Sequence, residues 1–174
     1  ILNSVTVGSA IVYVRTRELT SEISRYLNDN GISSMGYHAG LTTAEKDFRQ
    51  ANWTKNRVRV MVATNAFGMG IDKPDVRMVI HYSVPDSIEA YFQEAGRAGR
   101  DGQTSYAVLL YNNTDISVIS RREDETYPSK EYIRQTYENV SYFLQVGVGE
   151  AEGRTFYFPI ESFCRMFKQF PVQT

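Results

Sequence analysis

Cysteine is nearly absent from this chain of 174 residues: Cys164 is the only one, and histidine occurs twice, at His38 and His81. A single thiol cannot form an internal disulfide or a cysteine-based zinc cage, and two histidines add too few ligands for a closed structural zinc site. We therefore expect no zinc in this chain. A reducing, intracellular setting is the natural interpretation of so little cysteine.

An excess of one charge is also absent, because 19 basic side chains face 20 acidic ones, for a formal net charge of −1. There is thus no overall attraction to nucleic acid, and any contact with DNA must come from local groups such as helix starts and a few arginines. No apolar run approaches the roughly 20 residues that a membrane span needs. Residues 1–4 contain no signal peptide and no initiator methionine, so we expect a piece of a longer protein that is neither secreted nor inserted into a membrane.

What is present is a regular alternation of apolar, β-branched runs with stretches of helical period. Strands are expected at residues 10–14, 32–37, 58–63, 77–82 and 104–111, with helices at 17–30, 42–53 and 87–96. Gly31 is expected to end the first helix, Thr42 and Glu45 to form a capping box, and Asp86 to cap the third helix. This order predicts an α/β fold with a doubly wound parallel sheet and helices on both faces. Right-handed crossovers then place the loops after the strands along one edge, where such sheets bind ligands.

The pattern changes after about residue 112, so we divide the chain into residues 1–113 and a small, mainly helical appendage at 114–174. A turn is expected at Asn112–Asp115 and a charged, solvated stretch at 121–125. Further on, the sequence predicts a helix at 131–146, a glycine-rich loop, a short strand at 155–158 and a helix at 160–170.

The segment Gln93–Gly102 (QEAGRAGRDG) combines three glycines with two arginines. The glycines let a backbone approach a phosphate chain closely, and Arg97 and Arg100 can converge on one anionic target. Guanidinium binds phosphate through two parallel hydrogen bonds and keeps its charge. A lone Gly-Arg pair would instead indicate a solvated helix end. The whole decapeptide resembles the sixth motif of superfamily-two helicases, in its RecQ-type form.

Residues 62–74 (VATNAFGMGIDKP) resemble the fifth motif of RecQ helicases. Gly68 and Gly70 would let the loop pack beside a ligand, and Asp72 offers acceptors for ribose hydroxyls. Thr64, at a strand end, is placed to bond a DNA phosphate. Taken alone, Asp72 is as typical of a turn as of a ligand.

Two further segments match the same family. Residues 11–17 (IVYVRTR) occupy the place of the fourth motif, and residues 37–41 (YHAGL) resemble the segment that RecQ proteins carry after the second strand. The resemblance makes four residues candidate contacts to the DNA backbone: Thr16, Arg17, His38 and Gly40. In isolation His38 would more often be a histidine with structural partners. DEAD-box RNA helicases carry histidine-arginine where this chain has Gln93-Glu94, which favours the RecQ family.

The resemblance covers residues 8–113 and implies a RecA-like domain that closes over ATP and Mg²⁺ held mainly by the N-terminal RecA-like domain of the same parent chain. No GxxxxGK[ST] loop occurs here, so the fragment alone is expected to be inactive. By the family pattern, Arg100 is the arginine finger, and Arg97 and Gln93 couple the nucleotide state to domain closure. The activity implied is ATP-dependent DNA unwinding from three-prime to five-prime. DNA repair and recombination, and a cytoplasmic location (nucleoid-associated in a bacterium), are expectations from the family alone.

The chain departs from the family downstream. RecQ proteins usually follow this domain with a helical zinc-binding subdomain built on four cysteines, whereas residues 114–174 contain only Cys164. We interpret this segment as a metal-free replacement, whose residues 157–170 could open a winged-helix-like module. Two alternatives stay open: a non-catalytic nucleic-acid-binding or regulatory module with a helicase-derived fold, and an RNA helicase.

Overall fold

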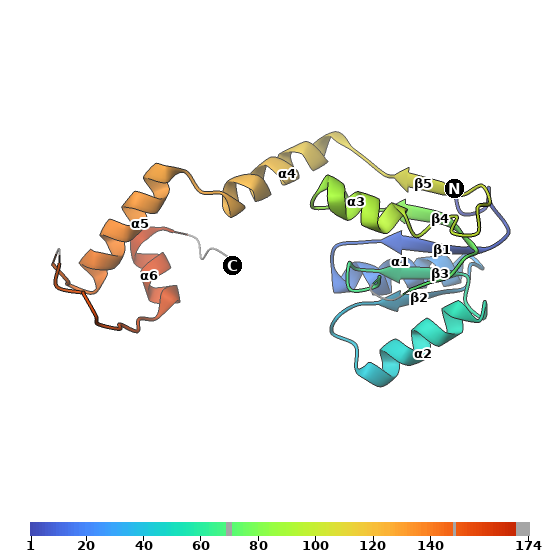
Figure 1. The fold of residues 1–174 in the computed structure, drawn as a ribbon, viewed down its shortest axis with the longest axis horizontal. Helices are drawn as coiled ribbons and strands as arrows, with labels where there is room; N and C mark the ends of the chain where they lie inside the picture. The colour runs from blue at the N-terminus through green and yellow to red at the C-terminus, as the bar shows by residue number, and fades with distance from the viewer. Residues whose placement is uncertain (69–70, 148, 170–174) are drawn as a thin grey trace. The chain divides into compact units, whose positions relative to one another are not determined.

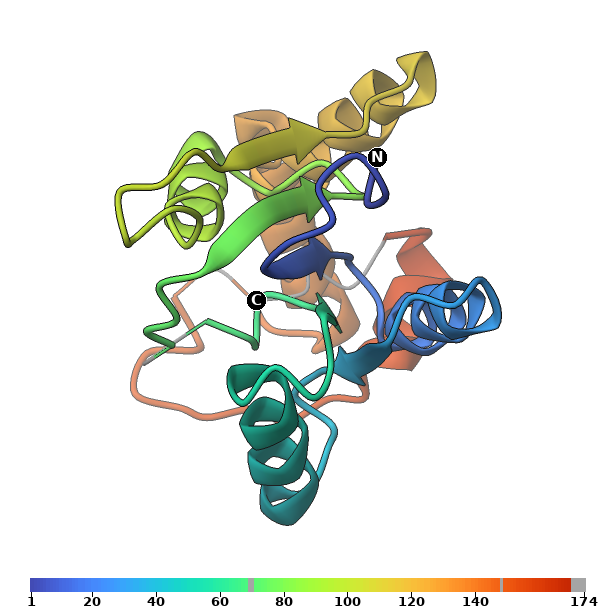
Figure 2. The same ribbon diagram turned by 90° about the vertical axis from the view of Figure 1, so that its right-hand side faces the viewer.

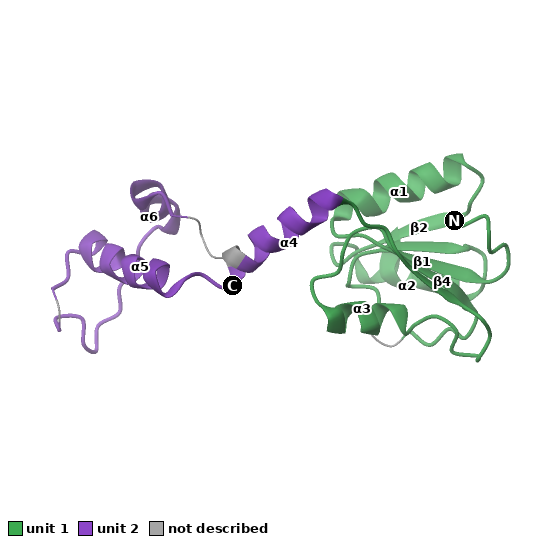
Figure 3. Ribbon diagram, turned by 90° about the horizontal axis from the view of Figure 1, so that it is seen from above, with its two compact units in different colours: residues 1–112 green, residues 113–174 purple. Residues whose placement is uncertain are grey.

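The computed structural model describes residues 1–68, 71–147 and 149–169. The chain divides into two compact units, residues 1–112 and residues 113–174 (Figure 3). The first unit contains the sheet, and the described part of the second is built from helices and loops.

The sheet of the first unit is parallel, with the strand order β2-β3-β1-β4-β5 (Figure 1). Its strands are β1 (Ser9–Tyr13), β2 (Ser34–Tyr37), β3 (Val60–Ala63), β4 (Val76–His81) and β5 (Tyr106–Leu109). The helices between them are α1 (Arg17–Asp29), α2 (Thr43–Thr54) and α3 (Ile88–Ala95). All of these elements were predicted, with ends that differ by a few residues, and the doubly wound α/β fold is confirmed.

The two faces of the sheet bury alternate residues of each strand, as a pleated strand requires. On β1, Ala10 and Val12 face the apolar side chains of α1. Ile11 and Tyr13 face the opposite side, where Trp53 of α2 is fully buried and donates its indole N–H to the Ala10 carbonyl at 3.2 Å. Helices therefore cover both faces, α1 on one and α2 and α3 on the other (Figure 2).

The predicted capping box of Thr42 and Glu45 is present at α2. The first helix begins at Arg17 as expected, with Thr16 as its cap, a role that was not predicted. The prediction for α3 was wrong by one residue: the Ser87 hydroxyl, and not the Asp86 carboxylate, accepts from the Ala90 amide at 3.1 Å. The Asp86 carboxylate instead forms an ion pair with Arg15, which draws it away from the helix start.

In the second unit, α4 (Asn113–Thr126), α5 (Lys130–Phe143) and α6 (Ile160–Phe167) are helical. The turn expected at Asn112–Asp115 was wrong, because α4 begins there and also takes in the charged stretch. The strand expected at residues 155–158 was also wrong: a strand needs a hydrogen-bonded partner, and the described residues of this unit contain none. Four aromatic rings instead hold the end of α5 against α6: Phe143, Phe158, Phe163 and Phe167.

No helix of the described residues has the length and apolar character needed to cross a membrane.

Candidate nucleotide and DNA site

The predicted DNA contacts come together at the carboxyl ends of three neighbouring strands. Thr16 and Arg17 follow β1, His38 and Gly40 follow β2, and Thr64 follows β3. The Thr64 amide donates to the Tyr37 carbonyl at 3.1 Å, which ties the ends of β2 and β3 together. The expectation that these residues share one edge of the sheet is therefore confirmed.

Arg17 is the most available cation in this group. Its guanidinium lies against Gly40, where a Cβ atom would come within 2.7 Å of Arg17 Nη1. Among the described residues, no hydrogen bond or ion pair engages that guanidinium. Burial, and then the positive charges of Arg17 and Arg49, lower the pKa of His38, whose buried Nδ1 has no hydrogen-bond partner in the described part of the chain. Arg17 thus presents a guanidinium without a partner among the described residues, and His38 presents a neutral imidazole.

The two threonines of this group are less available than Arg17. The Thr16 hydroxyl accepts from the Leu19 amide at 3.2 Å and also bonds the Glu18 carboxyl, whose pKa is lowered by its own backbone amide and then by this hydroxyl. Thr64 is 8% exposed, so a contact with DNA would use a small part of its surface.

Arg97 lies in the turn after α3 and reaches into the loop between β3 and β4. Its Nη1 donates to the Gly68 carbonyl, and a Cβ atom at position 68 would lie 2.4 Å from Arg97 Nη2. A side chain at position 68 would thus displace the guanidinium, which explains the glycine. Arg97 Nε is buried and has no partner among the described residues.

Arg100 reaches the same loop a few residues further on. Its Nη1 donates to the Ile71 carbonyl at 3.1 Å and to Asp72 Oδ1 at 2.9 Å. In the structure, Arg100 thus pairs with the Asp72 carboxylate. Asp101 is bound elsewhere: the hydrogen bond from Arg77, followed by that from the Gln103 amide, lowers the pKa of the Asp101 carboxyl.

Asp72 and Arg100 therefore meet just before β4, at the opposite edge of the sheet from the DNA candidates, whereas Arg97 binds Gly68 beside Tyr13 at the end of β1. Asp72 precedes β4, and the Gly99 amide donates to the carbonyl of Val76, the first residue of β4, at 3.0 Å. The expectation that ligand residues follow strands along one edge thus fails for this group, because the loop from residue 64 to residue 75 runs from the end of β3 back to the start of β4.

A buried lysine anchors this loop beside Asp72. Lys73 is 4% exposed, and its Nζ lies 2.7 Å from Asp75 Oδ1, 2.7 Å from Asn56 Oδ1 and 3.2 Å from the Thr54 carbonyl at the end of α2.

Of the two remaining predicted site residues, only Gln93 is among the described residues. Gln93 is exposed on α3, and no hydrogen bond of its side chain occurs among the described residues. Gly70 lies outside the described residues.

The sequence did not point to two buried polar residues beneath α3, Tyr13 and His81. His81 is fully buried, and its Nε2 lies 2.9 Å from Glu94 Oε2. The Tyr13 ring stacks on His81 with centroids 5.6 Å apart, and its hydroxyl donates to the Phe67 carbonyl at 3.0 Å. The available signal was that Tyr13 and His81 are polar residues within strands expected to be buried on both faces.

The family model for the helicase conserved C-terminal domain matches residues 1–102. The ATP-dependent DNA helicase Q-like 5 of Arabidopsis thaliana is 52% identical over 107 residues, which cover 62% of this chain and 12% of that protein. The RecQ-like DNA helicase BLM of Xenopus laevis is 42% identical over 137 residues, covering 78% of this chain and 10% of that protein. The chain belongs to the RecQ family of helicase C-terminal domains.

The matched part of this chain spans only about a tenth of the length of these curated relatives. Its fold also resembles that of S. cerevisiae Dbp5 L327V bound to RNA and ADP BeF3, with a TM-score of 0.59, 28% identity, and coverage of 69% of this chain and 33% of that one.

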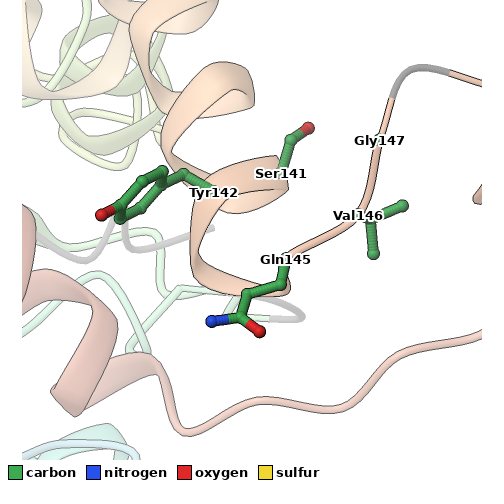
Figure 4. Close-up of a pocket in the computed structure, with 5 residues that line it drawn as sticks. All are labelled: Ser141, Tyr142, Gln145, Val146 and Gly147. Atoms are coloured by element: carbon green, nitrogen blue, oxygen red, sulfur yellow. The ribbon is translucent and has the colours of Figure 1, made fainter.

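The candidate site residues of the first unit fit an anionic nucleotide better than a metal ion. Arg97 offers a buried, unsatisfied N–H next to a glycine, which suits phosphate oxygens. In the described residues, no three His, Cys, Asp or Glu side chains gather where they could hold a metal. A pocket of the second unit, lined by Ser141, Tyr142, Gln145, Val146 and Gly147, carries no charge to attract phosphate (Figure 4).

Proposed function

We propose that this chain is the second motor domain of an ATP-dependent DNA helicase that unwinds DNA from three-prime to five-prime. The observation that carries the proposal is the convergence of Arg97 and Arg100 on the loop that also bears Asp72. The two guanidinium groups suit the phosphates of a nucleotide, and the Asp72 carboxylate beside Arg100 suits its ribose. The RecQ-family sequence relatives support this assignment because their names describe DNA helicases.

In this proposal the chain supplies only half of the nucleotide site. ATP provides the phosphoryl group, and Mg²⁺ and a phosphate-binding lysine would come from the N-terminal RecA-like domain of the same parent chain, because no GxxxxGK[ST] loop occurs here. Arg100 acts as the arginine finger, so it must exchange its contact with Asp72 for one with the γ-phosphate. Asp72 then becomes available to accept from ribose hydroxyls. Arg97 and Gln93 sense the nucleotide and couple it to closure of the two domains.

In this proposal, the segments that follow β1, β2 and β3 bind the backbone of one DNA strand. Arg17 provides the charge, and Thr16, His38, Gly40 and Thr64 line the same edge of the sheet. Such phosphate contacts hold position and carry little sequence preference. Because the chain has no net positive charge, we expect weak, salt-sensitive binding by this domain alone.

The second unit enters the proposal as a helical appendage in place of the zinc-binding subdomain of RecQ proteins, without bound zinc. A role in DNA repair or recombination, and a cytoplasmic or nucleoid location, stay predictions from the family.

The deciding experiment is ATP hydrolysis by the purified full-length protein, measured with and without single-stranded DNA and with RNA of the same sequence. Strong stimulation by DNA supports the proposal. Equal or greater stimulation by RNA would assign the enzyme to RNA instead. No hydrolysis in the presence of Mg²⁺ would leave a non-catalytic binding module.

A further inference from the structure

Two consecutive carbonyl groups of the β3–β4 loop are held by side chains from different parts of the fold. The Phe67 carbonyl accepts from the hydroxyl of Tyr13, the last residue of β1. The next carbonyl, that of Gly68, accepts from the guanidinium of Arg97, in the turn after α3. Tyr13 thus joins the strand that leads to Thr16 and Arg17 with the loop that receives Arg97.

The Tyr13 hydroxyl is well placed to act as a permanent donor. Tyr13 is 3% exposed, and burial raises its pKa to about 12; the nearby Arg97 charge opposes the rise, Glu94 adds to it, and a hydrogen bond with the Arg97 side chain opposes it further. The hydroxyl therefore keeps its proton throughout the physiological pH range. The ring is fixed by stacking on His81, which in turn pairs with Glu94 of α3 at 2.9 Å.

We propose that Tyr13 is a positioning residue. By holding the Phe67–Gly68 backbone, it links Arg97 to the edge of the sheet where the candidate DNA contacts lie. This inference rests on the proposed helicase function. A shift of β1 and of the start of α1, where Arg17 lies, is passed through the Tyr13 hydroxyl to the Phe67 carbonyl, and from the next peptide to the Arg97 guanidinium. Tyr13 touches neither nucleotide nor DNA in this arrangement.

The chain offers a matched control for this hydroxyl. Tyr37, at the end of β2, packs against the same Phe67 ring with centroids 4.7 Å apart and is 8% exposed. Its hydroxyl makes no hydrogen bond with any described residue. Tyr13→Phe and Tyr37→Phe therefore remove the same atom from the same cluster, but only the first leaves a buried carbonyl without its donor.

The first readout is amide hydrogen exchange of the full-length protein without ligands. In Tyr13→Phe we expect the amides of Phe67, Ile71 and Ala98 to exchange roughly fivefold faster than in the wild type, because the loop and the turn lose a buried hydrogen bond. In Tyr37→Phe the same amides should exchange at the wild-type rate. Equal rates in the two variants would overturn the positioning role.

The second readout is the ratio of ATP hydrolysis with saturating single-stranded DNA to that without DNA. In Tyr13→Phe this ratio should fall by roughly fivefold at unchanged DNA affinity, whereas Tyr37→Phe should keep it. A packing role alone would lower thermal stability and spare the ratio, and that result would also overturn the link. If the wild type shows no stimulation by DNA, the helicase proposal and the link both fail, whereas the exchange rates still decide whether Tyr13 holds the loop.

Discussion

Replacing Arg100 with alanine in the full-length protein tests the arginine finger against a purely structural role. In the structure Arg100 bonds the Asp72 carboxylate and the Ile71 carbonyl, and the side chains of the ion pair are 39% and 83% exposed. An ion pair this exposed contributes at most about 1 kcal/mol to stability. Loss of the pair should therefore leave the domain folded, and any large defect must arise elsewhere.

If Arg100 is the finger, its loss lowers the rate of hydrolysis more than the binding affinity, because the charge that it stabilises develops only in the transition state. Arginine fingers contribute about 10³–10⁵ in rate, which corresponds to roughly 4–7 kcal/mol. We expect DNA-stimulated hydrolysis by Arg100→Ala to fall by a factor in this range, with nucleotide and DNA binding largely kept. Lysine at this position should rescue poorly, because it keeps the charge and loses the planar fork.

Asp72→Asn is the matched variant, because it breaks the same ion pair and keeps the arginine. If Arg100 only steadies the loop through Asp72, the two substitutions will have similar effects, and combining them will add nothing further. If Arg100 is the finger, Arg100→Ala will be far more damaging to kcat than Asp72→Asn. Steady-state ATPase kinetics and thermal melting of the three variants decide between these outcomes. Near-normal kcat in Arg100→Ala would refute the assignment and move the finger to Arg97.

Three further predictions follow from the structure. The 174-residue chain alone should show no Mg²⁺-dependent ATP hydrolysis, and appreciable turnover by the pure fragment would contradict the half-site assignment. In the full-length protein, Arg17→Ala should weaken DNA binding and lower the slope of log affinity against log salt by about 1, whereas Arg25→Ala, further along the same helix, should change neither, as measured by fluorescence anisotropy. Lys73→Met should destabilise the domain by about 1–3 kcal/mol in urea unfolding, since it leaves the partners of a buried ammonium unpaired, whereas Lys55→Met at the exposed end of α2 should be nearly neutral.

The fold could be predicted well from the sequence because its decisive signals are local. The apolar, β-branched runs of β1 and β3 are typical of buried parallel strands, and the Thr42–Glu45 box marks the start of α2. Prediction failed where the outcome depends on distant partners. Arg15 takes the Asp86 carboxylate, so Ser87 becomes the cap.

The candidate site was likewise predictable from the sequence only in part. The resemblance to the fifth and sixth helicase motifs was enough to name Arg97, Arg100 and Asp72, and the structure places both arginines against the loop that bears Asp72. The carboxylate that pairs with Arg100 was not predictable from the sequence, because Asp72 and Asp101 were both candidates. In the structure Asp101 is engaged by Arg77. The roles of Arg97, Arg100 and Asp72 with nucleotide, and those of the DNA candidates, stay predictions.

The loop between β3 and β4 constrains how this protein can change its length. Thr64 lies at its start and Asp72 near its end, and the seven residues between them, which make eight Cα–Cα steps, span at most about 26–29 Å when fully extended. Its described residues contain no helix that could absorb an extra residue by adding part of a turn. An insertion or deletion here would therefore move one site against the other. The exposed turn around Gly31, which joins the end of α1 to the start of β2 and contains none of the candidate site residues, is a safer place to insert a tag or a fluorescent reporter.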